Sequence, residues 1–177
     1  PQNPKTPLSR SMSLYMQALT FAQPIRPLHW VIKVSNLKKT IDILKCLGCR
    51  LLRHEEFEAG CEASCNGPYA GYWSKSMVGF ENEHESFVFE LTYNYGVSKY
   101  ARGNDLGAIL LHKKNAEGVD IEAKMLAEFP EAKDALVDKT YRLVNDDLIF
   151  KFEDTQATGP QLVRGVELSV TDMGEAV

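Results

Sequence analysis

One carboxylate, Glu90, interrupts a run of residues that otherwise has the composition of a buried strand. The run is FELTYNYG, residues 89–96, and the immediate neighbours of Glu90 are Phe89 and Leu91. Successive side chains of a strand point to opposite faces, so Glu90 faces away from both of these apolar neighbours. An acid on this face predicts a role in binding or chemistry, because an ionised group is costly to bury without a partner.

A second strand-like segment, LHWVIKV at residues 28–34, places His29 and Lys33 together on its less apolar face. If this face and that of Glu90 line one hollow, His29 and Glu90 offer a nitrogen and an oxygen ligand to the same point. Such a pair suits Zn²⁺, Ni²⁺, Fe²⁺ or Mn²⁺. The alternative is that Glu90 is a structural carboxylate paired with Lys33.

The elements that position these residues follow a βαβββ order. The helix is predicted from the apolar spacing over residues 35–48, with Ser35 or Asn36 at its start and Gly48 at its end. The strands are expected at residues 28–34, 49–58, 72–80 and 85–93.

A weaker copy of this unit follows in the chain. It consists of a strand at residues 106–113, a helix at 119–129 that ends before Pro130, and a hairpin around an Asn-Asp-Asp turn. Residues 163–176 then read as a strand and the start of a helix, the opening of a third copy. The predicted division of the chain is a flexible leader at 1–27, modules at 28–104 and 105–156, a linker at 157–162, and the start of a further domain at 163–177.

The first 27 residues differ in composition from the rest. They contain five of the eight prolines, and no acid occurs before Asp42. A basic, acid-free segment with an amphipathic centre is typical of a mitochondrial transit peptide, and the alternative is a flexible terminus. The expected location is therefore cytoplasmic or mitochondrial.

Composition excludes some classes of partner. The 177 residues are 44% hydrophobic and 25% charged, with a net charge of −4, which argues against a nucleic-acid binder. No stretch approaches the roughly 20 apolar residues of a membrane-spanning helix. Four cysteines lie close together in the sequence, and we interpret them as reduced thiols rather than a zinc site. They are Cys46, Cys49, Cys61 and Cys65.

The segments LHWVIKVSN, LGCRLLRHEEF, FELTYNYG and RGND resemble the first module of glyoxalase I proteins in the vicinal oxygen chelate superfamily. The resemblance implies an α+β fold in which paired βαβββ modules form a cup-shaped mixed sheet, the glyoxalase/bleomycin resistance/dihydroxybiphenyl dioxygenase fold. It also implies that His29 and Glu90 are metal ligands, with Glu90 the candidate catalytic group. Lys33 and Asn94 fall at positions where the family binds its substrate.

The second half of the family's site is not matched. Alignment places Ala108 and Lys151 where glyoxalase I has a histidine and a glutamate, and neither can be that ligand. His112 lies on the same strand face as Ala108 but roughly 13 Å away, so it is a substitute ligand or a surface histidine. Glu167 in VELSV is a further candidate for completing the site.

Two functions follow from the resemblance. The first is a glyoxalase-like protein that acts on or binds thiol conjugates or small carbonyl compounds, as a lyase or isomerase if it is active. The second is a catalytically degenerate fold that serves as a binding or regulatory module. We expect a homodimer, or pairing within the chain with a second glyoxalase-like domain.

Overall fold

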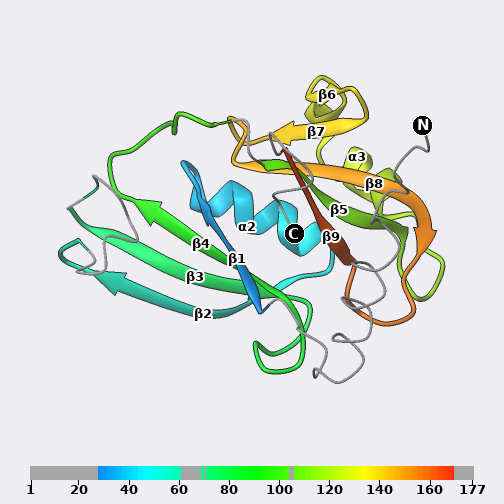
Figure 1. Cartoon of the computed structure of the whole chain (residues 1–177), viewed down its shortest axis with the longest axis horizontal. Helices are drawn as coiled ribbons and strands as arrows, with labels where there is room; N and C mark the ends of the chain where they lie inside the picture. Colours follow the sequence, from blue (N-terminus) through cyan, green and yellow to red (C-terminus); the bar gives the residue numbers. More distant parts are fainter. Residues whose placement is uncertain (1–27, 61–68, 70, 104–105, 170–177) are drawn as a thin grey trace, which may run out of the picture.

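The computed structural model describes residues 28–60, 69, 71–103 and 106–169. Among these residues, the first half of the chain contains one helix and four strands, which Figure 1 labels. In chain order they are β1 (His29–Lys33), α2 (Leu37–Cys46), β2 (Arg50–Phe57), β3 (Trp73–Gly79) and β4 (Val88–Asn94). The predicted βαβββ order is confirmed for this module.

The second half repeats this order, with a shorter helix and shorter middle strands. They are β5 (Leu106–Lys114), α3 (Ile121–Glu128), the 3₁₀ turn η1 (Pro130–Lys133), β6 (Leu136–Val137), β7 (Thr140–Leu143) and β8 (Leu148–Gln156). The strand β9 (Val163–Leu168) follows. The two-residue strand β6 was not predicted from the sequence, because so short a segment carries no periodicity.

The helices α2 and α3 each begin at a side-chain cap. The side chain of Asn36 accepts a hydrogen bond from the backbone N–H of Lys39, and that of Asp120 accepts one from Ala123. Each satisfies one of the N–H groups that a helix leaves unpaired at its start. The first helix ends before Gly48, whose φ of 102° is in the left-handed region that favours glycine.

The two sheets have equivalent strand orders. The first is β1-β4-β3-β2, and the second contains β5-β8-β7-β6 with β9 added beyond β5. In each module the first strand is parallel to the last. β9 pairs antiparallel with β5, so the segment predicted to open a third copy completes the second sheet in this structure.

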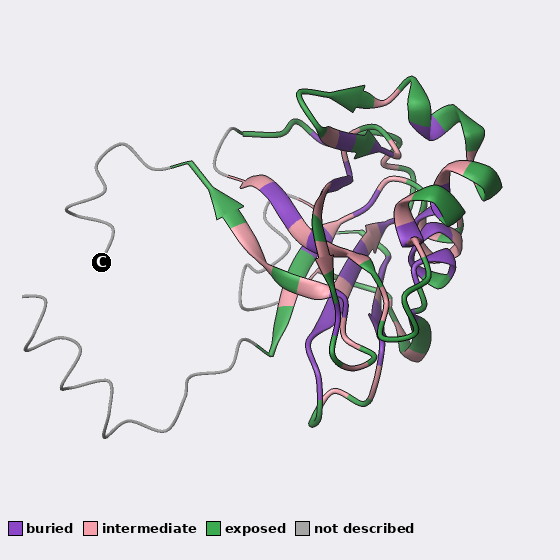
Figure 2. Cartoon of the chain, turned by 90° about the vertical axis from the view of Figure 1, so that its right-hand side faces the viewer, coloured by how far each residue is buried: buried purple, intermediate pink, exposed green. Residues whose placement is uncertain are grey.

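One apolar core joins the two modules. It includes Ile32, Leu44 and Phe89 from the first module and Ile109 and Phe150 from the second. Buried residues concentrate where sheets and helices pack together, and exposed residues lie along the outer edges (Figure 2). The core therefore fixes the apolar face of β1 and β4 and leaves their other face for polar side chains.

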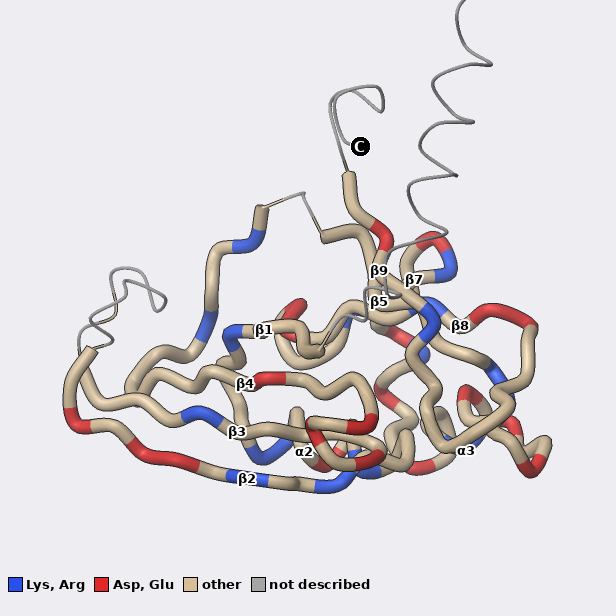
Figure 3. The backbone as a smooth tube through the Cα atoms, turned by 60° about the horizontal axis from the view of Figure 1, so that its bottom comes forward, with Lys and Arg blue, Asp and Glu red and all other residues tan. Residues whose placement is uncertain are grey.

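Charged residues of both signs are mixed over β2 and β3 (Figure 3). Arg53 pairs with Glu83 at 3.1 Å and also with Glu55, which pairs with Lys75 at 3.3 Å. No helix in the described part of the chain has the length and apolar character needed to cross a membrane.

Candidate functional site

His29 and Glu90 come together because β1 and β4 are neighbouring parallel strands. In their register Glu90 is opposite Val31, and His29 is opposite Val88. Nε2 of His29 lies 3.5 Å from Oε2 of Glu90, with 42% and 21% of the two side chains exposed. The nitrogen and the oxygen therefore face each other across the strand pair, at a partly exposed position.

The burial pattern explains why a carboxylate occurs in this strand. Phe89 and Leu91 are buried in the core, at 1% and 0% exposure, on the face that packs with Ile43 and Leu44 of α2. Glu90 is on the opposite face, with the exposed Val31 beside it. The strand thus carries apolar and ionisable side chains on different faces, as alternation predicts.

The pair is compatible with two adjacent positions around one divalent ion. Typical metal–nitrogen and metal–oxygen bonds of about 2.0–2.2 Å place neighbouring ligand atoms roughly 3 to 3.5 Å apart. Over the described residues, however, no group of three or more His, Cys, Asp and Glu side chains could hold a metal. This chain supplies two donors at this point, so further ligands would have to come from elsewhere.

A pocket of about 260 Å³ lies beside the imidazole of His29. Its lining comes from the first module only and includes Leu28, Glu83, His84 and Val88. Its walls are partly apolar, because they include the side chains of Val88, which is buried, and Leu28, which is exposed. A small organic group bound next to the His29–Glu90 pair would have room there.

The two predicted substrate-binding residues lie at the far ends of the same strands. Lys33 shares the β1 face of His29, and its carbonyl oxygen accepts a hydrogen bond of 2.6 Å from Nη2 of Arg102. Asn94 is 3% exposed, and its Nδ2 donates to the hydroxyl of Tyr100 at 2.9 Å. Burial raises the pKa of the Tyr100 hydroxyl, so it stays protonated beside this amide.

Three residues that the sequence did not identify as a cluster connect this end of β1 to the second module. The carboxylate of Asp147 accepts hydrogen bonds from the backbone N–H and the hydroxyl of Ser35, at 2.5 and 2.7 Å. It also pairs with Arg102 at 3.0 Å. Arg102 stands in the RGND segment, and Asp147 in the predicted turn, but their partners are too distant in sequence for a local pattern to reveal.

The corresponding position of the second module carries different chemistry. Lys151 is opposite Leu110, and Ala108 lies two residues before Leu110, just as His29 lies two residues before Val31. Ala108 and Lys151 therefore hold the places of His29 and Glu90. Nζ of Lys151 lies 3.0 Å from Oε2 of Glu167, which is opposite Ala108 on β9. Glu167 thus pairs with a lysine, and it forms no three-ligand group with His29 and Glu90.

The remaining histidines have other partners. Nδ1 of His112 lies 2.8 Å from the hydroxyl of Thr155, and burial together with the nearby Arg164 lowers its pKa. His54 is hydrogen-bonded to Ser76 and Glu56, both at 2.8 Å. His84 is exposed in the turn before β4. His112 belongs to no ligand cluster in the described ranges.

Two of the cysteines, Cys46 and Cys49, are buried free thiols. Burial, and then the neighbouring Glu128, raise the pKa of Cys46 to about 12, and burial raises the pKa of Cys49. Thiols of this kind are poor nucleophiles and poor metal ligands at neutral pH. Cys61 and Cys65 lie outside the described residues.

The aromatic residues near the end of β4 act in packing and hydrogen bonding. The rings of Tyr93 and Tyr95 are 5.0 Å apart, and the Tyr95 hydroxyl donates to the carboxylate of Glu56. That hydrogen bond lowers the pKa of Glu56 and raises the pKa of Tyr95.

Comparison with known proteins finds relatives that match about half of the chain. No model of a known protein family matches the chain. The chain is 58% identical to glyoxalase 1 of Caenorhabditis elegans over 87 residues, which are 49% of the chain. It is 54% identical to glyoxalase domain-containing protein 4 of Mus musculus over 92 residues, which are 51% of the chain. In each case the match spans 31% of the relative, so the chain covers about a third of their length. It is also 40% identical over 93 residues to lactoylglutathione lyase of Escherichia coli O157:H7, 52% of this chain and 61% of that protein.

Solved structures extend the similarity to both modules. The crystal structure of glyoxalase I from Zea mays matches 85% of this chain, and 52% of its own, with a TM-score of 0.62 and 23% identity. At that identity the match shows the fold, here over most of the chain. The chain is therefore similar in sequence to glyoxalase proteins over about half of its length, and it has the glyoxalase fold over most of it.

Proposed function

We propose that this chain binds thiol conjugates or small carbonyl compounds and supplies one half of a divalent metal centre of the glyoxalase I type. The observation that supports this proposal is the 3.5 Å separation of His29 Nε2 and Glu90 Oε2 on adjacent strands. The similarity to proteins named glyoxalase 1 and lactoylglutathione lyase supports the proposed substrate class.

The metal proposed here is Zn²⁺, Ni²⁺, Fe²⁺ or Mn²⁺, which accept an imidazole nitrogen and a carboxylate oxygen together. Such an ion would act as a Lewis acid on an oxygen of the substrate. Glu90 is the candidate for holding a proton near the reacting carbon, because its carboxylate is partly exposed and lies 3.5 Å from His29, which lines the pocket.

Lys33 is proposed to bind a carboxylate of the conjugate, since its side chain shares the β1 face of His29. A lysine there gives a point charge rather than the planar fork of an arginine, so orientation would depend on other contacts. Asn94 is the second proposed contact, through an amide whose Nδ2 already donates to Tyr100.

The missing ligands are proposed to come from a second copy of the chain or from a further glyoxalase-like domain. The His29–Glu90 face remains partly exposed, so another module can cover it. In keeping with this, we propose modules at 28–104 and 105–156, a linker at 157–162 and the start of a further domain at 163–177.

Metal titration tests the central pair. We expect Zn²⁺ or Ni²⁺, measured by calorimetry, to bind the unmodified chain and to bind His29→Ala and Glu90→Gln at least about tenfold more weakly, equivalent to 1.4 kcal/mol. Glu117→Gln, an exposed residue of a distant loop, is the matched control. Equal metal affinity in all four proteins would refute the proposal.

Substrate binding is tested separately. A glutathione conjugate should raise the melting temperature, because any ligand that prefers the native state stabilises it. Lys33→Ala should reduce this shift, and a hemithioacetal turnover assay on the same samples would detect activity. A melting temperature unchanged by saturating conjugate would argue against the substrate class.

A further inference from the structure

The turn between β7 and β8 has an unusual backbone. Val144, Asn145 and Asp146 all have positive φ, at 54°, 56° and 67°. Non-glycine residues rarely adopt this region, and a β-branched residue such as valine does so at a particular cost. Such strain persists only where the surrounding structure holds the backbone in place. The residue that follows these three is Asp147.

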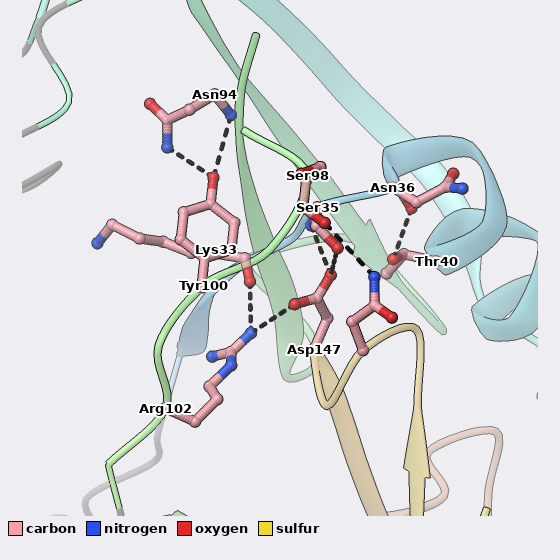
Figure 4. Close-up of polar contacts among 10 residues, drawn as sticks. Lys33, Ser35, Asn36, Thr40, Asn94, Ser98, Tyr100, Arg102 and Asp147 are labelled. Atoms are coloured by element: carbon pink, nitrogen blue, oxygen red, sulfur yellow. Dashed lines mark hydrogen bonds and ion pairs between the residues drawn. The ribbon is translucent and has the colours of Figure 1, made fainter. Parts of the chain in front are cut away.

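Asp147 reaches from the second module into the first. Its side chain has 0% exposure, and it accepts two hydrogen bonds from Ser35, which lies between β1 and α2. Its other oxygen pairs with Arg102 at 3.0 Å (Figure 4). Three donors thus compensate a fully buried carboxylate, which would otherwise be strongly destabilising.

Arg102 links Asp147 to the end of β1. The same nitrogen that meets Asp147, Nη2, donates to the carbonyl oxygen of Lys33 at 2.6 Å. Between these two anchored residues, the backbone N–H of Val34 donates to the carbonyl of Thr92 on β4 at 2.9 Å. Residues 33–35 are therefore held by β4 on one side and by Asp147 and Arg102 on the other.

We propose that Asp147 is a positioning residue: through Arg102 and Ser35, the second module fixes the backbone of Lys33, and with it the proposed carboxylate contact of the first module. This inference rests on the proposed function for the role of Lys33. The second module has Ala108 and Lys151 at the positions of His29 and Glu90. The inference nevertheless gives this module a part in binding the conjugate, through the first module.

The matched variants are Asp147→Asn and Asp146→Asn. Both remove one negative charge from the same turn, but Asp146 has no hydrogen bond or ion pair in the structure, whereas Asp147 has three contacts to Ser35 and Arg102. Ser35→Ala, which removes only the 2.7 Å contact, is the milder variant should Asp147→Asn fail to fold.

Two measurements keep the inference and the proposed function apart. Amide hydrogen exchange reports whether residues 33–35 are held, without any ligand. We expect exchange at these amides to be about 100-fold faster in Asp147→Asn and about tenfold faster in Ser35→Ala, with β3 amides unchanged and Asp146→Asn like the unmodified chain.

The second measurement is the affinity for a glutathione conjugate and for its methyl diester, which lacks the carboxylates. Asp147→Asn should weaken binding of the conjugate about tenfold and leave the diester unaffected, because only the carboxylate contact depends on Lys33. Equal exchange in all proteins, or an acceleration spread evenly over both modules, would overturn the positioning role. If the unmodified chain binds no conjugate but the local exchange change occurs, the proposed function fails and the positioning role stands.

Discussion

The two modules share a strand order and a register but differ at the positions that matter for chemistry. In the first, the β1–β4 pair presents His29 and Glu90 at 3.5 Å. In the second, the β5–β8 pair presents Ala108 and Lys151 at the equivalent places, and Lys151 is paired with Glu167. The fold is therefore retained where the proposed ligand pair is not.

The second module shows how such a set can be replaced without loss of the sheet. Ala108 is fully buried, and Glu167 is opposite it on β9. Because β5 lies between β8 and β9, the side chains of Lys151 and Glu167 must meet across β5. A small residue such as Ala108 leaves space for them. The preceding residue, Gly107, fits the same strand closely, because an added Cβ would lie 3.1 Å from the carbonyl oxygen of Glu167. Docking of β9 thus depends on small residues in β5.

The largest expected effect tests whether the two modules are one folding unit. Phe89 and Phe150 are equivalent residues, each preceding the position of Glu90 or Lys151, and they are 1% and 0% exposed in the same core. Replacing either by alanine should lower the free energy of unfolding by about 3–5 kcal/mol, through lost burial and a cavity. Urea denaturation followed by fluorescence and by circular dichroism would measure this.

Tyr72→Ala, at 62% exposure, is the control, with an expected change within about 0.5 kcal/mol. Because the core is shared, both phenylalanine variants should unfold in a single transition. Two separate transitions, with only one of them moved by each variant, would show that the modules fold independently and would break the comparison.

Much of this arrangement follows from the sequence, and the reasons are local. Alternation around Glu90 and in residues 28–34 placed the two ligand candidates on the right faces, and Asn36 marked the start of the first helix. These signals act over a few residues. By contrast, the pairing of β9 with β5 could not be predicted, because nothing in a strand's own sequence states which edge it will join.

The contacts that organise the site's surroundings are also non-local. Asp147 and Ser35 are 112 residues apart in sequence, and Lys151 and Glu167 are 16 residues apart on strands separated by β5. The sequence showed that Lys151 could not be a family ligand but not what it would pair with. Pairings of this kind depend on packing of the finished fold, which periodicity does not encode.

An intermediate effect is expected on giving the second module the proposed ligands of the first. Ala108→His with Lys151→Glu places an imidazole and a carboxylate in the register of His29 and Glu90, beside the carboxylate of Glu167. Without metal this variant should be less stable, because the ion pair is replaced by two like charges. With Zn²⁺ at 100 times its Kd, it should gain about 2.7 kcal/mol.

Thermal unfolding with and without Zn²⁺, in a His29→Ala background, isolates the new site. Lys151→Glu alone is the matched control, since it adds the carboxylate without the imidazole. If Zn²⁺ stabilises the combined variant no more than this control, the two modules are not equivalent in geometry, despite their shared register.

The smallest effect concerns a histidine that the second module has and the first lacks at the equivalent place. His112 is half-buried beside Arg164, hydrogen-bonded to Thr155 and opposite Glu153, which itself pairs with Arg164. Burial and then the arginine lower its pKa, so near pH 6 the unfolded chain binds more protons at this residue than the folded chain. Stability should therefore fall as the pH drops below about 6.5, the ordinary pKa of histidine.

His112→Gln removes this contribution while keeping a group that can hydrogen-bond Thr155. Urea unfolding at pH 7.5 and 5.5 should show a smaller loss of free energy on acidification for His112→Gln than for the unmodified chain. A larger loss in the variant would mean that Glu153 outweighs burial and Arg164 and holds the imidazole in its charged form.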